Sequence, residues 1–209
     1  MRPNAIENEG TVPIANDRLE RQIRFIVEAD RLKQVLRRNR LVDGSRRENT
    51  AEHSWHLTLM AVVLAEHANA PVDLLRVLKM LIVHDVVEID ADDTFCYDPQ
   101  GMASKEEKER RAAERLFGLI PEPGGSELKA LWEEFEARQT PEARFAAALD
   151  RVQPVLANYL TDGGTWREYG VTYDQVMQRL RPIADGSEVL WDYVQGLIEE
   201  AVRRGDIVK

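Results

Sequence analysis

The chain has little that could cross-link it or hold it in a membrane. It contains one cysteine, Cys96, so no intrachain disulfide can form and a reducing cytoplasm is favoured. No apolar run approaches the roughly 20 residues that span a bilayer. The amino-terminal residues "MRPNAIENEGTVP" also lack the apolar segment of a signal peptide. We therefore expect a cytoplasmic protein with no membrane partner.

Basic residues are in the minority. The sequence has 28 Lys and Arg against 37 Asp and Glu, which gives a formal net charge of −9. This balance argues against a nucleic-acid polymer as partner, because no broad basic surface is available for its backbone. It does not exclude a small phosphate monoester, since a local pocket of metal and arginine can capture one inside an acidic protein.

Repeats, low-complexity tracts and convincing β alternation are also lacking, whereas helical apolar spacing recurs along most of the chain. The sequence therefore predicts one all-α domain at residues 14–205, after a frayed or disordered segment at residues 1–13. A chain of 209 residues can form a stable hydrophobic core without disulfide bonds. A turn is expected at "VDGS", residues 42–45. Helices are expected at about residues 14–40, 50–69, 72–88, 104–120, 126–137, 141–160, 172–180 and 187–205.

Histidine is rare, and its distribution points to a metal site. Three of the four histidines fall in "ENTAEHSWH", residues 48–56, and "IVHDVVEIDADDT", residues 82–94. The two helices that carry them are joined by a short connection and should pack antiparallel. His53, near the start of one helix, would then lie beside His84 and Asp85, near the end of the next.

The surroundings of Asp85 strengthen this interpretation. Asp85 lies in the apolar run "KMLIVHDVVEI", and a buried carboxylate is costly without a compensating group. Nitrogen and oxygen ligands together suit Zn, Mn, Fe, Co or Ni better than Ca. His56, three residues after His53, is interpreted as a flanking residue, with a second ligand as the alternative. His67 lies about 21 Å further along that helix and is interpreted as structural.

These stretches resemble a known family. The segments "RRENTAEHSWHL" and "LKMLIVHDVVEIDADDT", followed by "EEKERRAAE" and "LWEEFEA", are similar to HD-domain phosphohydrolases of the 5′-deoxynucleotidase, or HD-domain-containing protein 2, group. The resemblance covers about residues 19–160. It implies an HD-domain helical bundle, often homodimeric, with one divalent metal ion. The implied ligands are His53, His84, Asp85 and Asp150, the last in "ALDRVQPVL"; the metal could be Mn, Co, Zn, Fe, Ni or Mg.

The resemblance also implies catalytic and substrate-binding residues. Glu88, three residues after Asp85, matches the acid–base residue, and Asp93 matches the acidic residue that follows it. Which of these two carboxylates accepts the proton of the attacking water stays open. Arg38 matches the arginine that holds the phosphate, and Arg46 is a second basic candidate.

Two neighbouring positions bear on that substrate site. Glu48 would orient the loop or an arginine. Asn39 stands where the bacterial deoxynucleotidase has a tryptophan, which puts selectivity for a deoxy sugar in doubt.

The predicted activity is removal of phosphate from (deoxy)nucleoside 5′-monophosphates. Alternatives are a guanosine tetraphosphate hydrolase and a non-catalytic metal-binding regulatory module. A dinuclear HD enzyme is disfavoured, because such families place further histidines after the His-Asp pair and this chain has none after His84. A purely structural site would not need an open coordination position beside Glu88 and Asp93.

Overall fold

The structure, a computed structural model, describes residues 16–97 and 99–209, with only the backbone described for residues 99–103. The predicted frayed segment, residues 1–13, lies outside the described residues. None of the described helices is long and apolar enough to cross a membrane.

Helices make up most of the described chain, which confirms the all-α prediction, and the only sheet in the described ranges is a two-stranded antiparallel one. In chain order the elements are α1 (Asp17–Ala29), η1 (Asp30–Gln34), β1 (Leu36–Arg40), β2 (Arg47–Asn49), α2 (Thr50–Leu64), η2 (Ala65–His67), α3 (Leu74–Val83), α4 (Glu88–Ala91), α5 (Pro99–Phe117), α6 (Gly124–Ala137), α7 (Pro141–Leu160), α8 (Gly164–Glu168), α9 (Tyr173–Leu180), α10 (Ile183–Gly186) and α11 (Glu188–Arg204).

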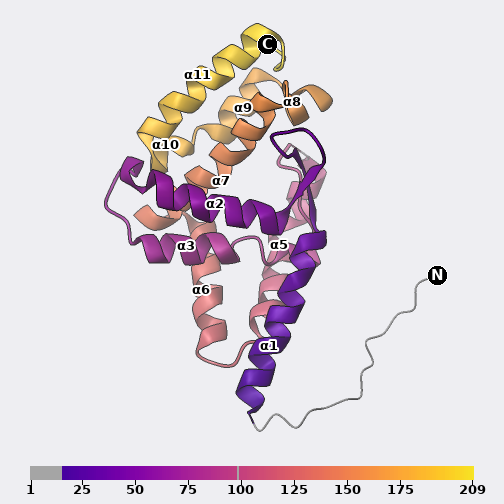
Figure 1. The fold of residues 1–209 in the computed structure, drawn as a ribbon, viewed down its shortest axis with the longest axis vertical. Coiled ribbons are helices and arrows are strands. Elements are labelled where there is room, and N and C mark those ends of the chain that lie inside the picture. Colours follow the sequence, from indigo (N-terminus) through magenta and orange to yellow (C-terminus); the bar gives the residue numbers. More distant parts are fainter. Residues whose placement is uncertain (1–15, 98) are drawn as a thin grey trace, which may run out of the picture.

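Helix α7 is the central element. It begins where the Thr140 side chain accepts a hydrogen bond from the Ala143 N–H, with Pro141 in the first turn, where its missing N–H costs nothing. It packs against α2, α3, α6, α10 and α11, and Figure 1 shows it running through the middle of the molecule. Residues 145–149 of α7 are all fully or almost fully buried. A residue in this helix, such as Asp150, is therefore held in a fixed place.

Helices α2 and α3 form the antiparallel pair that the sequence predicts. Asn49 and Glu52 form a capping box at the start of α2, and Asp73 caps α3. The two helices lie side by side in Figure 1 and are in contact. Their pairing brings the first turn of α2 next to the last turn of α3, so His53 and His84 lie close together.

The helix predicted at residues 14–40 is wrong in its last third. Helix α1 ends at Ala29, the 3₁₀ turn η1 follows, and residues 36–40 form strand β1. Strand β1 pairs with β2 around the predicted turn, where Gly44 takes a left-handed conformation with φ 70°. Inside β1, Arg37 and Asn39 are more buried than Leu36, Arg38 and Arg40, an alternation of period two that five residues could not reveal next to a helical pattern.

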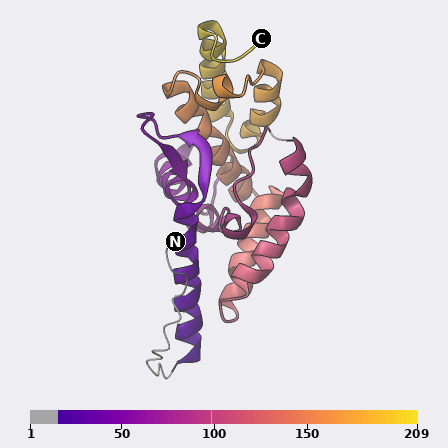
Figure 2. The same cartoon turned by 90° about the vertical axis from the view of Figure 1, so that its right-hand side faces the viewer.

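Two other helix boundaries differ from the prediction. Helix α3 ends at Val83, and the chain turns before α4 begins at Glu88, because the Val86 and Glu88 N–H groups bond to carbonyls only three residues back. Helix α5 begins at Pro99, so Ser104 lies inside the helix and is not its cap. Short helices α8 and α10 were not expected. Figure 2 shows α1 extending as a rod below the hairpin, with α5 and α6 on the other side.

Candidate metal centre

Three of the four predicted ligands converge on one point. His53, His84 and Asp150 each offer a ligand atom, and these atoms lie within 4.8 Å of one another. Asp85 lies at the edge of this cluster, with its Oδ2 atom 3.1 Å from His84 Nε2 and 3.8 Å from His53 Nε2. The structure therefore brings the predicted ligand residues together, from α2, α7 and the turn after α3.

The imidazoles are oriented by their other ring nitrogens. His84 Nδ1 lies 2.9 Å from the Leu81 carbonyl oxygen, which fixes a hydrogen there and turns Nε2 toward the cluster. That Nε2 is buried and, among the described residues, has no partner in hydrogen-bond geometry. His53 Nδ1 lies 3.2 Å from Gln153 Oε1 and Nε2 lies 3.1 Å from Asp150 Oδ1. Two oriented Nε2 atoms beside carboxylates fit a divalent cation.

The charge states of two groups in this cluster suit a cation, and the charge of the third depends on its carboxylate neighbours. Burial would lower the pKa of His84, but Asp85 and Asp150 raise it. Burial, assisted by the Arg37 charge, lowers the pKa of His53 to about 4, so His53 is neutral at pH 7, the form that ligates a metal. Burial would raise the pKa of Asp150, but the bond with His53 and the nearby positive charges hold that pKa well below its usual range. The Asp150 carboxylate is therefore anionic at pH 7.

A largely buried arginine that the sequence analysis missed lies against the cluster. Arg37 Nη1 is 3.3 Å from Asp85 Oδ2 and 3.6 Å from Asp93 Oδ1, and Arg37 Nε is 3.7 Å from Glu48 Oε2. Although burial disfavours the charge, Asp85 and the other carboxylates raise the Arg37 pKa above its ordinary value. Glu48 thus lies where it can orient an arginine, as expected, but that arginine is Arg37.

Gln153 is a second missed residue. Its Nε2 donates to Glu48 Oε1 at 2.9 Å, while its Oε1 faces His53 Nδ1. The amide therefore links Glu48 to the His53 ring and sets the orientation of that ring. His56 Nδ1 lies 3.5 Å from Gln153 Nε2, so His56 flanks the cluster through this amide. His67 lies in η2, and its carbonyl accepts a bond from the Ser187 hydroxyl.

Glu88 and Asp93 lie beside the cluster and line the adjoining cavity. Glu88 is 4% exposed, and the Thr50 hydroxyl donates to its Oε2 at 3.0 Å. Burial, with the charges of Asp85 and Asp93, raises the pKa of Glu88 well above its ordinary value. Burial also raises the pKa of Asp93. Raised pKa values are typical of carboxyl groups that exchange protons in catalysis.

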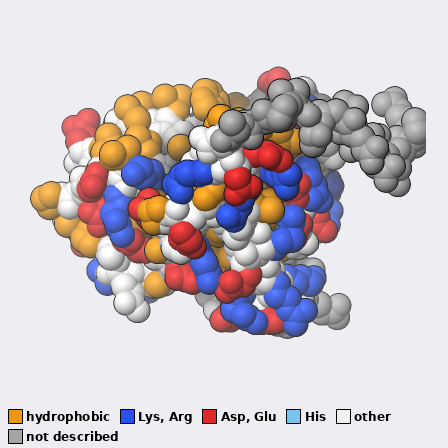
Figure 3. Space-filling model, turned by 90° about the horizontal axis from the view of Figure 1, so that it is seen from below, with side chains coloured by type: hydrophobic (Ala, Val, Ile, Leu, Met, Phe, Trp, Pro, Cys, Tyr) orange, Lys and Arg blue, Asp and Glu red, His pale blue; other side chains and the backbone are white. Residues whose placement is uncertain are grey.

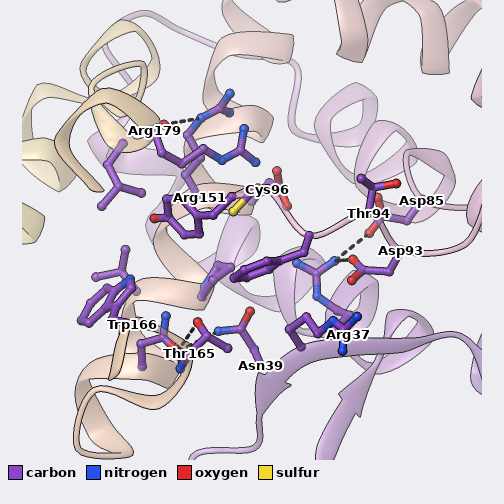
Figure 4. Close-up of a pocket in the computed structure, with 18 of the residues that line it drawn as sticks. Arg37, Asn39, Asp85, Asp93, Thr94, Cys96, Arg151, Thr165, Trp166 and Arg179 are labelled. Atoms are coloured by element: carbon purple, nitrogen blue, oxygen red, sulfur yellow. Dashed lines mark hydrogen bonds and ion pairs between the residues drawn. The ribbon is translucent and has the colours of Figure 1, made fainter. Parts of the chain in front are cut away.

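The cavity has a volume of about 100 Å³ and opens from the cluster toward the carboxyl-terminal helices. Figure 4 shows Arg37, Asp85 and Asp93 at one side and Arg151, Arg179 and Trp166 at the other. Its lining residues are Arg37, Arg38, Asn39, Asp85, Glu88, Asp93, Thr94, Phe95, Cys96, Tyr97, Lys105, Asp150, Arg151, Pro154, Val155, Asn158, Thr165, Trp166, Arg179 and Leu180.

The two predicted substrate-binding arginines lie in different places. Arg38 lines the cavity. Arg46 does not line it and is exposed, with its guanidinium 2.6 and 2.8 Å from the two Glu52 carboxylate oxygens. Substrate binding by either arginine stays a prediction, with geometric support for Arg38 alone.

Asn39 is part of the cavity wall. Its Nδ2 donates to Asn158 Oδ1 at 3.0 Å, and Asn158 Oδ1 also accepts from the Thr165 N–H and hydroxyl at 3.0 and 3.1 Å. All three side chains line the cavity and are buried. The position that departs from the bacterial deoxynucleotidase thus presents a fixed amide to the cavity.

Comparisons with known proteins agree on one family. The family model described as HD domain matches residues 29–191. The bovine protein named 5′-deoxynucleotidase HDDC2 is 32% identical over 110 residues, 52% of this chain and 52% of the bovine protein. The human protein of that name is 27% identical over 135 residues, 64% of this chain and 65% of the human one. The matched segment therefore spans about half to two thirds of these relatives.

A solved structure matches over nearly the whole chain. The crystal structure described as a predicted metal-dependent phosphohydrolase from Magnetospirillum magnetotacticum MS-1 is 52% identical, with a TM-score of 0.90, and covers 95% of this chain and 100% of the other. A conserved hypothetical protein from Pyrococcus furiosus shares the fold, with 24% identity, a TM-score of 0.59 and coverage of 87% of this chain and 99% of that one.

Proposed function

The chain belongs to the HD domain family, and from that premise we propose that it is a metal-dependent hydrolase that releases phosphate from (deoxy)nucleoside 5′-monophosphates. One observation carries this proposal: the cluster of His53, His84 and Asp150 opens onto a cavity lined by Glu88 and Asp93. The names of the bovine and Magnetospirillum proteins support the same reaction class.

We propose that His53, His84, Asp85 and Asp150 hold one divalent ion, which would be Mn, Co, Zn, Fe, Ni or Mg. Such an ion would supply Lewis-acid polarisation of a phosphoryl oxygen and make water more acidic. The donor set fits it, because His84 Nε2 is buried without a hydrogen-bond partner among the described residues and His53 is neutral.

The chain's own groups supply proton transfer. Glu88 or Asp93 accepts the proton of the water whose oxygen attacks phosphorus, and the bond from phosphorus to the 5′-oxygen breaks. The leaving 5′-oxygen takes a proton from the carboxyl group or from water. Arg38 lies in the cavity wall, where it can stabilise the negative charge that develops on the phosphoryl oxygens. Arg37, tied to Asp85, Asp93 and Glu48, keeps these carboxylates in place.

The proposal is tested by restoring single metals to chelator-stripped protein. Phosphate release is measured from ribo- and deoxynucleoside 5′-monophosphates, with 3′-monophosphates and guanosine tetraphosphate as controls. Metal-dependent release from the 5′-monophosphates is the expected result. The absence of release from every nucleotide, with one metal bound per chain, would contradict the proposal and favour the non-catalytic module. Release from guanosine tetraphosphate alone would favour the other hydrolase.

We also propose that the protein is a homodimer whose contact includes α1 and the outer faces of α2 and α3. Helix α1 has no buried residue, although Leu19, Ile23, Ile26 and Val27 form an apolar stripe along it. Large apolar side chains are also exposed on the outer faces of the two following helices, and hydrophobic side chains gather along the upper edge of Figure 3. These side chains are Trp55, Leu59, Val62, Val63, Leu75 and Ile82.

An exposed apolar surface of this kind marks a contact with another protein surface. We expect light scattering to give twice the chain mass for the natural protein and a shift toward the monomer for Ile26→Lys. A monomeric natural protein would contradict the proposed dimer.

Two further proposals concern the domain organisation and the cellular compartment of the protein. We propose that residues 14–205 form a single HD domain, because most of the buried apolar residues between Leu32 and Ala201 belong to one core cluster. We also propose a cytoplasmic location, supported by the single cysteine.

A further inference from the structure

Two arginines of the cavity wall lie across the cavity from Arg37 and, in the part of the chain that the structure describes, have no acidic partner. Arg151 comes from α7 and Arg179 from α9, and Figure 4 places both across Cys96 from Arg37, Asp85 and Asp93. Among the described residues, no carboxylate oxygen lies within the 4.0 Å of an ion pair from either guanidinium.

Arg151 is fixed by hydrogen bonds to the backbone, whereas the Arg179 side chain is not. Arg151 is 4% exposed, and its Nη1 donates to the Ala147 carbonyl at 2.8 Å. Its Nε donates to the Arg179 carbonyl at 3.3 Å, which ties α9 to α7. The Arg179 side chain makes no hydrogen bond or ion pair with the other described residues, so its guanidinium is free to meet a ligand.

The positive charges of Arg151 and Arg179 have no negative charge paired with them among the described residues. Arg151 is buried, and Arg151 and Arg179 both line the same cavity. Two neighbouring positive charges in a cavity wall cost free energy until a negative charge joins them. A nucleobase carbonyl would satisfy N–H donors but not the charge, whereas a phosphate or carboxylate satisfies both.

We propose that the cavity holds a second anion-binding subsite at Arg179, positioned by Arg151, and that the substrate class is a nucleoside 5′-phosphate with a second phosphate on its sugar. This inference rests on the proposed function, because it takes the phosphate that is released to lie at the metal centre. The second phosphate binds and is not cleaved, so no further chemical step is involved.

The test compares Arg179→Gln with Arg181→Gln, which changes an exposed arginine outside the cavity. Binding is measured by calorimetry in a Glu88→Gln background, so that turnover does not consume the nucleotide. The probes are deoxyadenosine 3′,5′-bisphosphate and adenosine 2′,5′-bisphosphate, each against the 5′-monophosphate with the same sugar. We expect at least one bisphosphate to bind roughly tenfold more tightly than its monophosphate, since one charge-assisted contact has about that value.

The variants decide where that preference comes from. Arg179→Gln should abolish the preference while leaving monophosphate binding unchanged, and Arg181→Gln should retain it. Equal affinity for bisphosphates and monophosphates in the natural sequence would overturn the subsite. So would an equal loss of affinity for both classes in Arg179→Gln.

Phosphate release by the protein with Glu88 intact separates the two proposals. Release from monophosphates, without any bisphosphate preference, would keep the proposed function and reject the subsite. A bisphosphate preference that disappears in Arg179→Gln, without release from any nucleotide, would keep the subsite and reject the proposed function.

Discussion

The two sides of the cavity carry charge in different ways. At the metal centre, Arg37 lies within ion-pair distance of Asp85, Asp93 and Glu48, and Asp150 lies beside His53. On the other side, Arg151 and Arg179 have no such partners among the described residues. Charges that are paired within the chain hold one another in position before a ligand arrives, and preorganised charge is what a reaction centre needs. Unpaired charges instead remain available to a ligand.

The largest effect is expected from breaking the metal centre itself. Asp150→Asn keeps the size of the side chain but removes the negative charge beside His53 Nε2, 3.1 Å away. We expect loss of the bound metal and a fall of phosphate release to the detection limit. Metal content per chain by mass spectrometry, with an unchanged circular dichroism spectrum as the control for folding, checks this. Full metal content in Asp150→Asn would remove Asp150 from the ligand set.

A smaller effect is expected from removing proton transfer while the ligands remain. Glu88→Gln retains the acceptor for the Thr50 hydroxyl but cannot exchange a proton. We expect kcat to fall by roughly 10² to 10⁴, the usual contribution of general acid–base catalysis, with metal content unchanged. The matched control is Glu109→Gln, which changes another buried glutamate, paired with Lys105 and outside the cavity lining. A fully active, metal-loaded Glu88→Gln protein would transfer the role to Asp93.

Removing the side chain that orients His53 should have a smaller effect again. Gln153→Leu removes the amide that faces His53 Nδ1 and donates to Glu48. We expect metal affinity to fall by roughly 10- to 100-fold, as for other residues that orient a metal ligand. Competition with a chelator measures this affinity. Unchanged affinity would mean that packing around His53, not the amide, sets its orientation.

The difference between the two sides also explains what the sequence could predict. His53 and His84 were placed together correctly, because helical spacing and a short connection are local features that determine an antiparallel pair. The family resemblance then placed Asp150 and Glu88. The places of these residues in the fold are set by the α2–α3 pair and by α7, and the sequence predicts all three helices.

The residues that the sequence could not reveal depend on distant contacts. Arg37 was missed because the apolar spacing of α1 continues to Leu36, the first residue of β1. Pairing with β2 overrides that helical pattern and turns the Arg37 guanidinium inward. Gln153 is a neutral amide whose importance comes from Glu48, 105 positions away. The bond between Asn39 and Asn158 joins residues 119 positions apart. No local pattern carries such information.

The smallest effects should separate an unpaired arginine from a paired one. Arg38 lines the cavity and makes no ion pair with the described residues, whereas the Arg46 guanidinium is already held by both oxygens of Glu52 outside the cavity. We expect Arg38→Gln to raise KM for a nucleoside 5′-monophosphate about tenfold, the value of one charge-assisted contact. Arg46→Gln should leave KM and kcat within twofold of the natural protein's values, because the Arg46 charge is already paired with Glu52 and screened by solvent. Steady-state kinetics of the two variants on the same nucleotide gives both results.

If Arg46→Gln raised KM as much as Arg38→Gln, the ion pair between Arg46 and Glu52 would have to open when substrate binds. Pairing within the chain would then no longer distinguish charges that position other groups from charges that bind a ligand.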